Sequence, residues 1–203
     1  RDKYMGLQDY FRLEGFAYRF VPLKSKSDNI QVGGVNTGLM YKQMMEEFTW
    51  GNMEKPDVYI DENNSRMMMN IRNNFNRLAE ALIQEGKKDS AIAVLDRCVE
   101  LIPHKTVPYN YFTIMMAESY FKAGADTKGS EIIKLMNGLY LQEMDYYLSL
   151  NEKFAPVVDE EIQRILYFMR EMNTICTQNG QENLAKEILE SFNKYLKIYS
   201  SSK

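Results

Sequence analysis

Few side chains in this sequence are of the types that do chemistry, and none of them stands in a catalytic or metal-binding pattern. His104 is the only histidine and lies in an expected loop, so a serine or cysteine nucleophile would have no suitable base. Asp57, Asp61 and Glu62 fit a solvated helix cap, because closeness in sequence does not give carboxyl groups different environments. Gly33-Gly34 lacks the lysine and hydroxyl residue of a phosphate loop. The sequence therefore predicts no catalytic residue, no cofactor and no metal ion.

The two cysteines, Cys98 and Cys176, are too few for a disulfide framework. Both fall on predicted inward faces of helices, where a thiol is usually a small buried apolar group. We therefore expect no redox or metal role for them. Cysteine usage leaves the cellular compartment open.

Composition and charge narrow the classes of partner. The chain has 203 residues and a formal net charge of -3, with dispersed lysines and arginines. No basic run with interleaved aromatics occurs, so we expect no nucleic-acid partner and no attraction to an anionic membrane surface. No apolar run approaches the roughly 18 residues that a membrane crossing needs. The chain begins Arg-Asp-Lys-Tyr, and we expect it to be cut from a longer protein.

The elements that would position any functional side chain follow a repeat, which is clearest from residue 72 to Pro103. It resembles one helix-turn-helix unit of the tetratricopeptide kind, with a period of about 34 residues. Gly86 marks the turn, Ala91 the close helix crossing, and Asp89 or Ser90 caps the second helix. The positions expected to be buried are Phe75, Leu78, Ala79, Leu82, Leu95, Cys98 and Val99.

Two further units use Gly124 and Gly180 as turn glycines, 38 and 56 residues along (124 − 86 and 180 − 124). In the second unit Gly129 replaces the crossing alanine. In the third the extra length predicts two overlong helices, 127–154 and 157–179, which break at Ala155-Pro156. Their facing side chains are expected to be Tyr140, Met144, Tyr147 and Phe154 on one helix and Ile162, Ile165, Leu166 and Met169 on the other. A terminal helix, 182–199, is expected to bury Ala185, Leu189 and Phe192.

The N-terminal segment mixes helical and extended signals. We expect a short helix ending near Gly15, then a strand over 16–23 that pairs with 58–60 or crosses the helices as an arm. A loop is expected over 24–29 and at Gly33-Gly34, and a helix of about three turns after the cap Asn36. The first repeat helix should begin near Ser65. The predicted fold is all-α, with about three tetratricopeptide-like units in 65–203 preceded by an irregular N-terminal segment, 1–64.

Stacked repeats present a concave face lined by their first helices, and this face is a natural binding surface. Its mixture of aromatics and amides would suit an extended peptide. The alternative is that the N-terminal segment fills the groove itself, and the sequence does not choose between the two. The face lacks the basic residues that clamp a C-terminal carboxylate. The projected groove positions are Asn73, Asn76, Glu80, Tyr111, Ile114, Glu118, Phe121, Tyr167, Arg170 and Thr174.

Several strings resemble one family. They are GLQDYFRLEGFAYRFVPLK at 6–24, FTWGNM near Trp50, VYIDENN at 58–64, IRNNFNRLAEALIQEGKKDSAIAVLDRC from Ile71, and VPYNYF from Val107. Together they resemble the soluble C-terminal region of multi-pass bacterial membrane proteins that are common in Bacteroidetes. Those proteins look like protein O-mannosyltransferases and have no assigned function.

The resemblance implies that any sugar transfer belongs to a membrane domain upstream of this chain, so no catalytic residue is carried over. It also implies a location at the periplasmic face of the inner membrane, with the cytoplasm as the open alternative. The expected function is noncatalytic: binding a protein or peptide acceptor, or bracing the chain's own membrane domain. A free-standing tetratricopeptide-type adaptor is the alternative. An enzyme in its own right would need converging titratable groups between the N-terminal segment and the first repeat.

Overall fold

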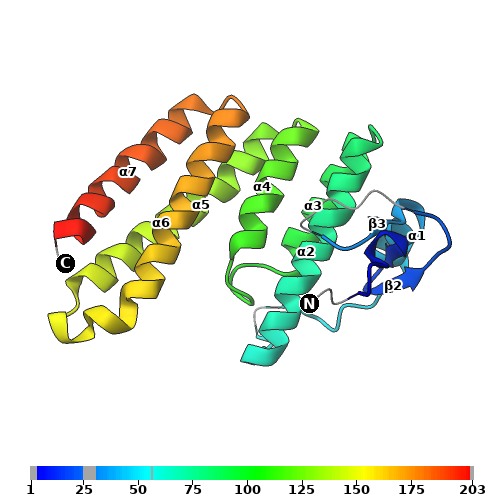
Figure 1. The fold of residues 1–203 in the computed structure, drawn as a ribbon, viewed down its shortest axis with the longest axis horizontal. Coiled ribbons are helices and arrows are strands. Elements are labelled where there is room, and N and C mark those ends of the chain that lie inside the picture. The colour runs from blue at the N-terminus through cyan, green and yellow to red at the C-terminus, as the bar shows by residue number, and fades with distance from the viewer. Residues whose placement is uncertain (1–3, 25–30, 56, 202–203) are drawn as a thin grey trace. The chain divides into compact units, whose positions relative to one another are not determined.

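The fold is all-α, with helical repeats that follow an irregular N-terminal segment, as the sequence predicts. This computed structural model describes residues 4–24, 31–55 and 57–201, and seven α-helices occur within them (Figure 1). The chain forms two compact units, Arg1–Pro108 and Tyr109–Lys203. The predicted boundary at 64/65 falls inside the first unit. No described helix combines the length and hydropathy that a bilayer crossing requires.

The first unit opens with a small sheet. A 3-10 turn, η1 (Gln8–Tyr10), leads into β1 (Phe11–Glu14), which pairs antiparallel with β2 (Ala17–Phe20) and parallel with β3 (Gly34–Val35). The hairpin turn is Gly15-Phe16. Gly15 has a φ of +61° and Phe16 a negative φ, the arrangement of a type II′ turn with glycine at its first central position. The strand order is β2-β1-β3, so β2 lies at one end of the sheet.

This sheet corrects two predictions for the N-terminal segment. Residues 11–14 are a strand and not the end of a helix, and the partners of β1 are β2 and β3 instead of 58–60. The pairing with β3 depends on Gly33, which has a φ of +72°. A Cβ at Gly33 would lie 2.4 Å from the backbone oxygen of Phe11. Only glycine allows the chain to pass so close to β1 at this point. Residues 25–30 of the predicted loop lie outside the described residues.

The remaining elements of the first unit are helical. Asn36 caps α1 (Thr37–Lys42), as predicted, and a π-helical turn, η2 (Gln43–Glu47), follows it. Asp61 caps α2 (Glu62–Gln84), which begins before the predicted Ser65, and α3 (Lys88–Leu101) completes the first helix pair. Asp89 and Ser90 do not cap α3: its N-cap is Lys87, without a side-chain bond, and both residues lie inside the helix.

The second unit consists of two helix pairs: α4 (Tyr111–Ala123) packs on α5 (Asp126–Ser149), and α6 (Ala155–Gln178) packs on α7 (Glu182–Ser201) (Figure 1). A short turn, η3 (Glu152–Phe154), separates α5 from α6 near the predicted break. The overlong helices α5 and α6 pack on each other, with Tyr140, Met144, Ile162 and Ile165 buried as expected. Phe154 is exposed, against the prediction, because it lies in η3 beyond the end of α5.

The three predicted turn glycines have the same backbone geometry. Gly86, Gly124 and Gly180 have φ values of +78°, +89° and +72°. At each turn the glycine N–H donates to the carbonyl three residues back, and the next N–H donates to the carbonyl five residues back, at distances of 2.8–3.3 Å. This Schellman arrangement satisfies carbonyls that the end of a helix would otherwise leave open. The repeat period found in the sequence therefore has a physical basis.

The helix crossings follow from small residues. Ala91 is fully buried, and a Cβ at Gly129 would lie 2.7 Å from the Phe121 ring, so only glycine lets α4 and α5 approach this closely. One expected core position in α7 is wrong. Leu189 is exposed, and the helix instead buries Leu184, Ala185, Ile188 and Tyr195, which lie at i, i+1, i+4 and i+11 on one face.

Candidate functional site

The predicted groove positions are divided between the two units. In the first unit Asn76 is fully buried, whereas Asn73 and Glu80 are half-buried. The side-chain oxygen of Asn73 is buried and accepts no hydrogen bond from the described part of the chain. Because its side chain is fully buried, Asn76 is not available to a ligand in this conformation.

In the second unit the groove aromatics form a cluster. The ring of Tyr111 stacks on Phe168 at 5.8 Å, and Tyr167 meets the same ring edge-on at 5.8 Å. The guanidinium of Arg170 lies 5.8 Å from the centroid of the Tyr167 ring, within cation–π range. Burial raises the pKa of the Tyr111 phenol, and the nearby Tyr167 adds to the shift. The groove positions predicted from the sequence include Tyr111, Tyr167 and Arg170 of this cluster but not Phe168, whose ring contacts both tyrosines.

The remaining groove positions of the second unit lie outside this aromatic cluster. Phe121 and Ile114 are core residues, and Phe121 fills the space that Gly129 leaves at the helix crossing. Glu118 forms a surface ion pair with Lys122 at 2.7 Å. The Thr174 hydroxyl donates to the backbone of Arg170. Among all the groove positions predicted in the second unit, the exposed side chains are those of Tyr167, Arg170 and Thr174.

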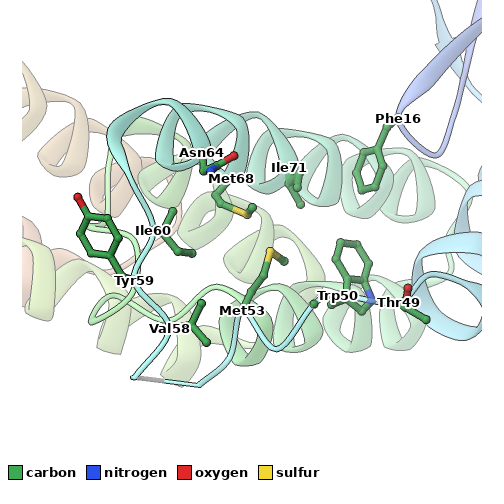
Figure 2. A pocket seen from close by; sticks show the side chains of 11 residues that line it. Phe16, Thr49, Trp50, Met53, Val58, Tyr59, Ile60, Asn64, Met68 and Ile71 are labelled. Atoms are coloured by element: carbon green, nitrogen blue, oxygen red, sulfur yellow. The ribbon is translucent and has the colours of Figure 1, made fainter.

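A cleft in the first unit offers a better-formed site. It lies between the segment 49–60 and the first half of α2, has a volume of about 430 Å³, and is bounded at one end by Phe16 from the hairpin turn (Figure 2). Figure 2 shows Met68 on α2 and Met53 on the opposite segment extending toward each other across it. The lining residues are Phe16, Thr49, Trp50, Gly51, Met53, Val58, Tyr59, Ile60, Asn64, Met68 and Ile71.

Aromatic rings hold one end of the cleft in place. Phe16 stacks on Phe48 at 5.1 Å and meets Trp50 edge-on at 5.9 Å. Trp50 in turn packs on Phe75 at 5.4 Å, and Phe75 is fully buried in the core of the first helix pair. Such ring contacts contribute about 0.5–1.5 kcal/mol each beyond the area they bury. This end of the cleft is therefore fixed to the core of the first unit.

The chemistry of the lining is apolar. Among the described residues that line the cleft, the polar side chains are Thr49, Asn64 and Tyr59, and none is an acid, a base or a thiol. The enzyme hypothesis required converging titratable groups between the N-terminal segment and the first repeat. A cleft exists there, but its lining supplies hydrophobic surface with a few neutral hydrogen-bonding groups.

Two buried arginines on α2 fix the irregular segments of this unit. Arg72 donates to the carbonyls of Pro108, Ile102 and Val107 at 2.7, 3.0 and 2.5 Å. Arg77 donates to the Tyr18 hydroxyl at 2.6 Å and to the carbonyls of Val32 and Gly33 at 2.8 and 3.2 Å. Because loop carbonyls lack the partners that a helix provides, one guanidinium with five donors can satisfy several of them. Neither arginine is among the functional residues predicted from the sequence.

Two of the titratable groups considered first in the sequence, Cys98 and Cys176, lie in the protein core. Burial raises the pKa of the Cys98 thiol to about 12 despite the nearby Arg72, and burial does the same for Cys176. Neither cysteine is in a disulfide, and both are buried, as predicted. Burial and Arg72 together lower the pKa of His104. In the described part of the chain, no group of three or more His, Cys, Asp or Glu side chains could hold a metal ion.

Comparisons with known proteins give no relative. No protein-family model matches the chain, and neither the curated proteins nor the solved structures provide a match.

Proposed function

We propose that this chain is a noncatalytic interaction domain whose first unit binds an apolar side chain, or a short apolar segment, of a protein partner in the cleft beside α2. The observation that supports it is the apolar lining of that cleft. Its volume of about 430 Å³ falls within the range of about 300–1,000 Å³ that is usual for ligand sites. A charged ligand group would lose its hydration there without gaining a charged partner, so the cleft selects neutral groups.

The methionines of the cleft favour a partner surface over one rigid small molecule. Met53 and Met68 face each other across it, and Met67 and Met69 flank Met68 on α2. Methionine has three rotatable bonds and a polarisable sulfur, so it adapts to different apolar shapes. The opposite end is rigid because Trp50 is packed on the core. One fixed aromatic wall and one adaptable wall suit the anchoring side chain of a protein.

The wider role that we propose follows from the resemblance in the sequence. The chain serves as a domain of a membrane glycosyltransferase-like protein at the periplasmic face, where it positions acceptor proteins or braces the membrane domain. The contacts of Arg77 support the alternative in which the N-terminal segment braces the repeats of this chain, since they tie residues 18 and 32–33 to the first repeat helix. The free-standing adaptor is the second candidate. The parent reading frame distinguishes them, because several apolar spans upstream of Arg1 would establish the attachment.

The cleft can be tested with the only tryptophan of the chain. Trp50 lines the cleft, so its fluorescence reports occupancy directly. Titration with capped peptides that carry a single Leu or Phe should shift Trp50 emission to shorter wavelength. Met68→Asp should abolish the shift because it places a charge in the apolar lining. Met67→Asp, one residue along the same helix and largely exposed, is the matched control.

The cleft would be rejected as the binding site if Met67→Asp and Met68→Asp changed the Trp50 emission shift equally. It would also be rejected if the peptides bound to the protein without shifting the Trp50 emission. The alternative in which residues 1–60 brace the repeats and fill their groove has its own test. If residues 1–60 complete the first helix pair, their deletion should destroy cooperative unfolding. A 61–203 fragment that melts as cooperatively as the whole chain would exclude bracing of the repeats by the N-terminal segment. Alanine at Tyr111 and Tyr167 tests the predicted groove as a binding surface. A pull-down in which partner binding survives both changes would exclude the groove as that surface.

A further inference from the structure

The strand β2 has an open edge. Val21 N–H donates to the Tyr10 carbonyl at 2.8 Å, which makes Tyr10 and Val21 a hydrogen-bonded pair of the hairpin. Such pairs alternate along an antiparallel ladder, so Arg12 and Arg19 form the next one. The N–H and C=O groups of Tyr18 and Phe20 therefore point away from β1. Neither residue's backbone bonds to any other described element.

The two faces of this edge strand differ in chemistry. Tyr18 and Phe20 share one face with Leu13 and Phe11, their partners in the register. The other face carries Arg19, Arg12 and Glu14. All four residues of β2 are exposed. An incoming strand would therefore meet aromatic side chains on one face and a charged group on the other.

The charged face has an excess of positive charge. Arg12 and Arg19 are directly opposite each other, an arrangement of like charges that is unfavourable in a sheet. Glu14 is the only carboxylate in β1 and β2. It already accepts from Arg19 at 2.7 Å and from Asn36 at 3.0 Å. Arg12 forms no ion pair with a described residue, and the Arg19 side chain is 65% exposed. A second carboxylate beside these arginines would complement the surface.

We propose that β2 is a docking edge for an extended, acidic segment of another protein, which adds as a fourth strand. The segment pairs its backbone with Tyr18 and Phe20, places a Glu or Asp opposite Arg19, and places apolar side chains on either side of that residue against Tyr18 and Phe20. Strand addition of this kind takes its affinity from backbone hydrogen bonds and its specificity from alternate side chains.

A second copy of this chain fits the edge less well. In an antiparallel β2–β2 pairing, the register that uses both outward-facing residues pairs Tyr18 with Phe20 of the other copy. That register puts Arg19 directly opposite Arg19, where the two charges repel. The acidic segment removes this repulsion, because it places a carboxylate opposite Arg19.

The test uses the full chain, labelled with nitrogen-15, and the capped peptide Thr-Val-Glu-Val-Thr. We expect the amide signals of Tyr18 and Phe20 to shift and their hydrogen exchange to slow when the peptide is added. The same peptide with Lys in place of Glu should bind at least tenfold more weakly. A peptide methylated on both valine nitrogens should not bind, because it has lost its backbone donors.

Two variants make the result specific. Phe20→Pro removes one outward N–H without touching a bond to β1, and proline is tolerated at such edge positions, so the fold should persist while peptide binding is lost. Arg19→Glu should reverse the preference so that the Lys peptide binds better. Unchanged Tyr18 and Phe20 amides at millimolar peptide, or equal binding to Phe20→Pro, would overturn the proposal. Slowed exchange that depends on protein concentration alone would also overturn it, because it would assign the edge to a second copy.

This inference is independent of the apolar cleft. Met68→Asp should leave peptide addition to β2 unchanged, and Phe20→Pro should leave the Trp50 titration unchanged. Failure of one site can therefore be recognised without doubt about the other.

Discussion

Replacement of Arg72 is the most direct test of how the first unit is held together. Its side chain is 1% exposed and donates to three carbonyls from the segment that follows α3. In Arg72→Ala these carbonyls lose their charged donor, and a cavity opens in place of a large side chain. We expect the free energy of unfolding of the first unit to fall substantially.

The size of the effect follows from two opposing contributions. A hydrogen bond to a charged group contributes about 1.5–3 kcal/mol, so the three bonds contribute roughly 5–9 kcal/mol before any cost is counted. Burying the guanidinium costs several kcal/mol, and this cost disappears in the alanine variant. The net loss should be about 3–5 kcal/mol, close to what removal of one partner from a buried charged network usually costs. The total free energy of unfolding of a protein domain is about 5–15 kcal/mol.

Urea unfolding followed by Trp50 fluorescence measures this loss, because the only tryptophan belongs to the first unit. Arg72→Lys keeps the charge but replaces the planar fork with a single ammonium group, and it should lose about half as much. Arg66→Ala is the control on the same helix. Its side chain is 69% exposed and forms only an i,i+4 pair with Glu62, so the loss should stay below about 0.5 kcal/mol. A loss below about 1 kcal/mol for Arg72→Ala would refute the assigned role.

Three further predictions concern the second unit and the thiols. Gly129→Ala should destabilise the protein by about 1–2 kcal/mol, because its Cβ would lie 2.7 Å from a buried ring. Gly138→Ala on the same helix meets nothing within 4 Å and should stabilise the protein by about 0.5–1 kcal/mol. Thermal unfolding of the two variants checks this, and equal shifts of their melting temperatures would contradict it. Cys98 and Cys176 should not react with Ellman's reagent at pH 8 in the native protein and should both react in guanidinium, since burial raises each pKa to about 12; fast reaction of either native thiol contradicts the assignment. Burial and the bond to a nearby carboxylate raise the pKa of Tyr195 to about 12, above its ordinary value near 10, so folding favours the neutral phenol. The contribution of Tyr195 to the stability of the fold is therefore complete below about pH 10 and is lost as the pH rises toward 12. Urea midpoints compared across that range should show this pH dependence in the unchanged protein and a weaker one in Tyr195→Phe.

The helical repeats could be predicted from the sequence because their signals are local. Each helix pair needs an apolar stripe with helical spacing and a glycine that can adopt a positive φ at the turn. Gly86, Gly124 and Gly180 supply that turn, and the same two hydrogen bonds form at each one. The departures, at Leu189 and Phe154, occur near helix ends or on the terminal helix, where the buried stripe is less constrained by neighbours on both sides.

The small sheet could not be predicted in the same way. The partner of β1 on one side is Gly34–Val35, which is too short to show alternation. Residues 58–60 have a better strand composition, yet they line the apolar cleft instead. What selects Gly34–Val35 is the close approach that Gly33 permits and the hydrogen bonds from Arg77, both of which depend on tertiary contacts. The cleft was missed for the same reason, since most of its lining comes from a segment without periodicity.

The two arginines of α2 show how a regular helix can specify irregular structure. Arg77 binds carbonyls at residues 32 and 33, and Arg72 binds carbonyls at residues 102, 107 and 108. Neither segment can satisfy these groups internally, so each takes its conformation from a donor on the helix. Arg77 also holds the Tyr18 hydroxyl, and Tyr18 belongs to the exposed edge of β2. The position of that edge is therefore determined by a side chain that a partner strand would not touch, and loss of Arg77 should weaken strand addition even though every group that pairs with the partner is still present.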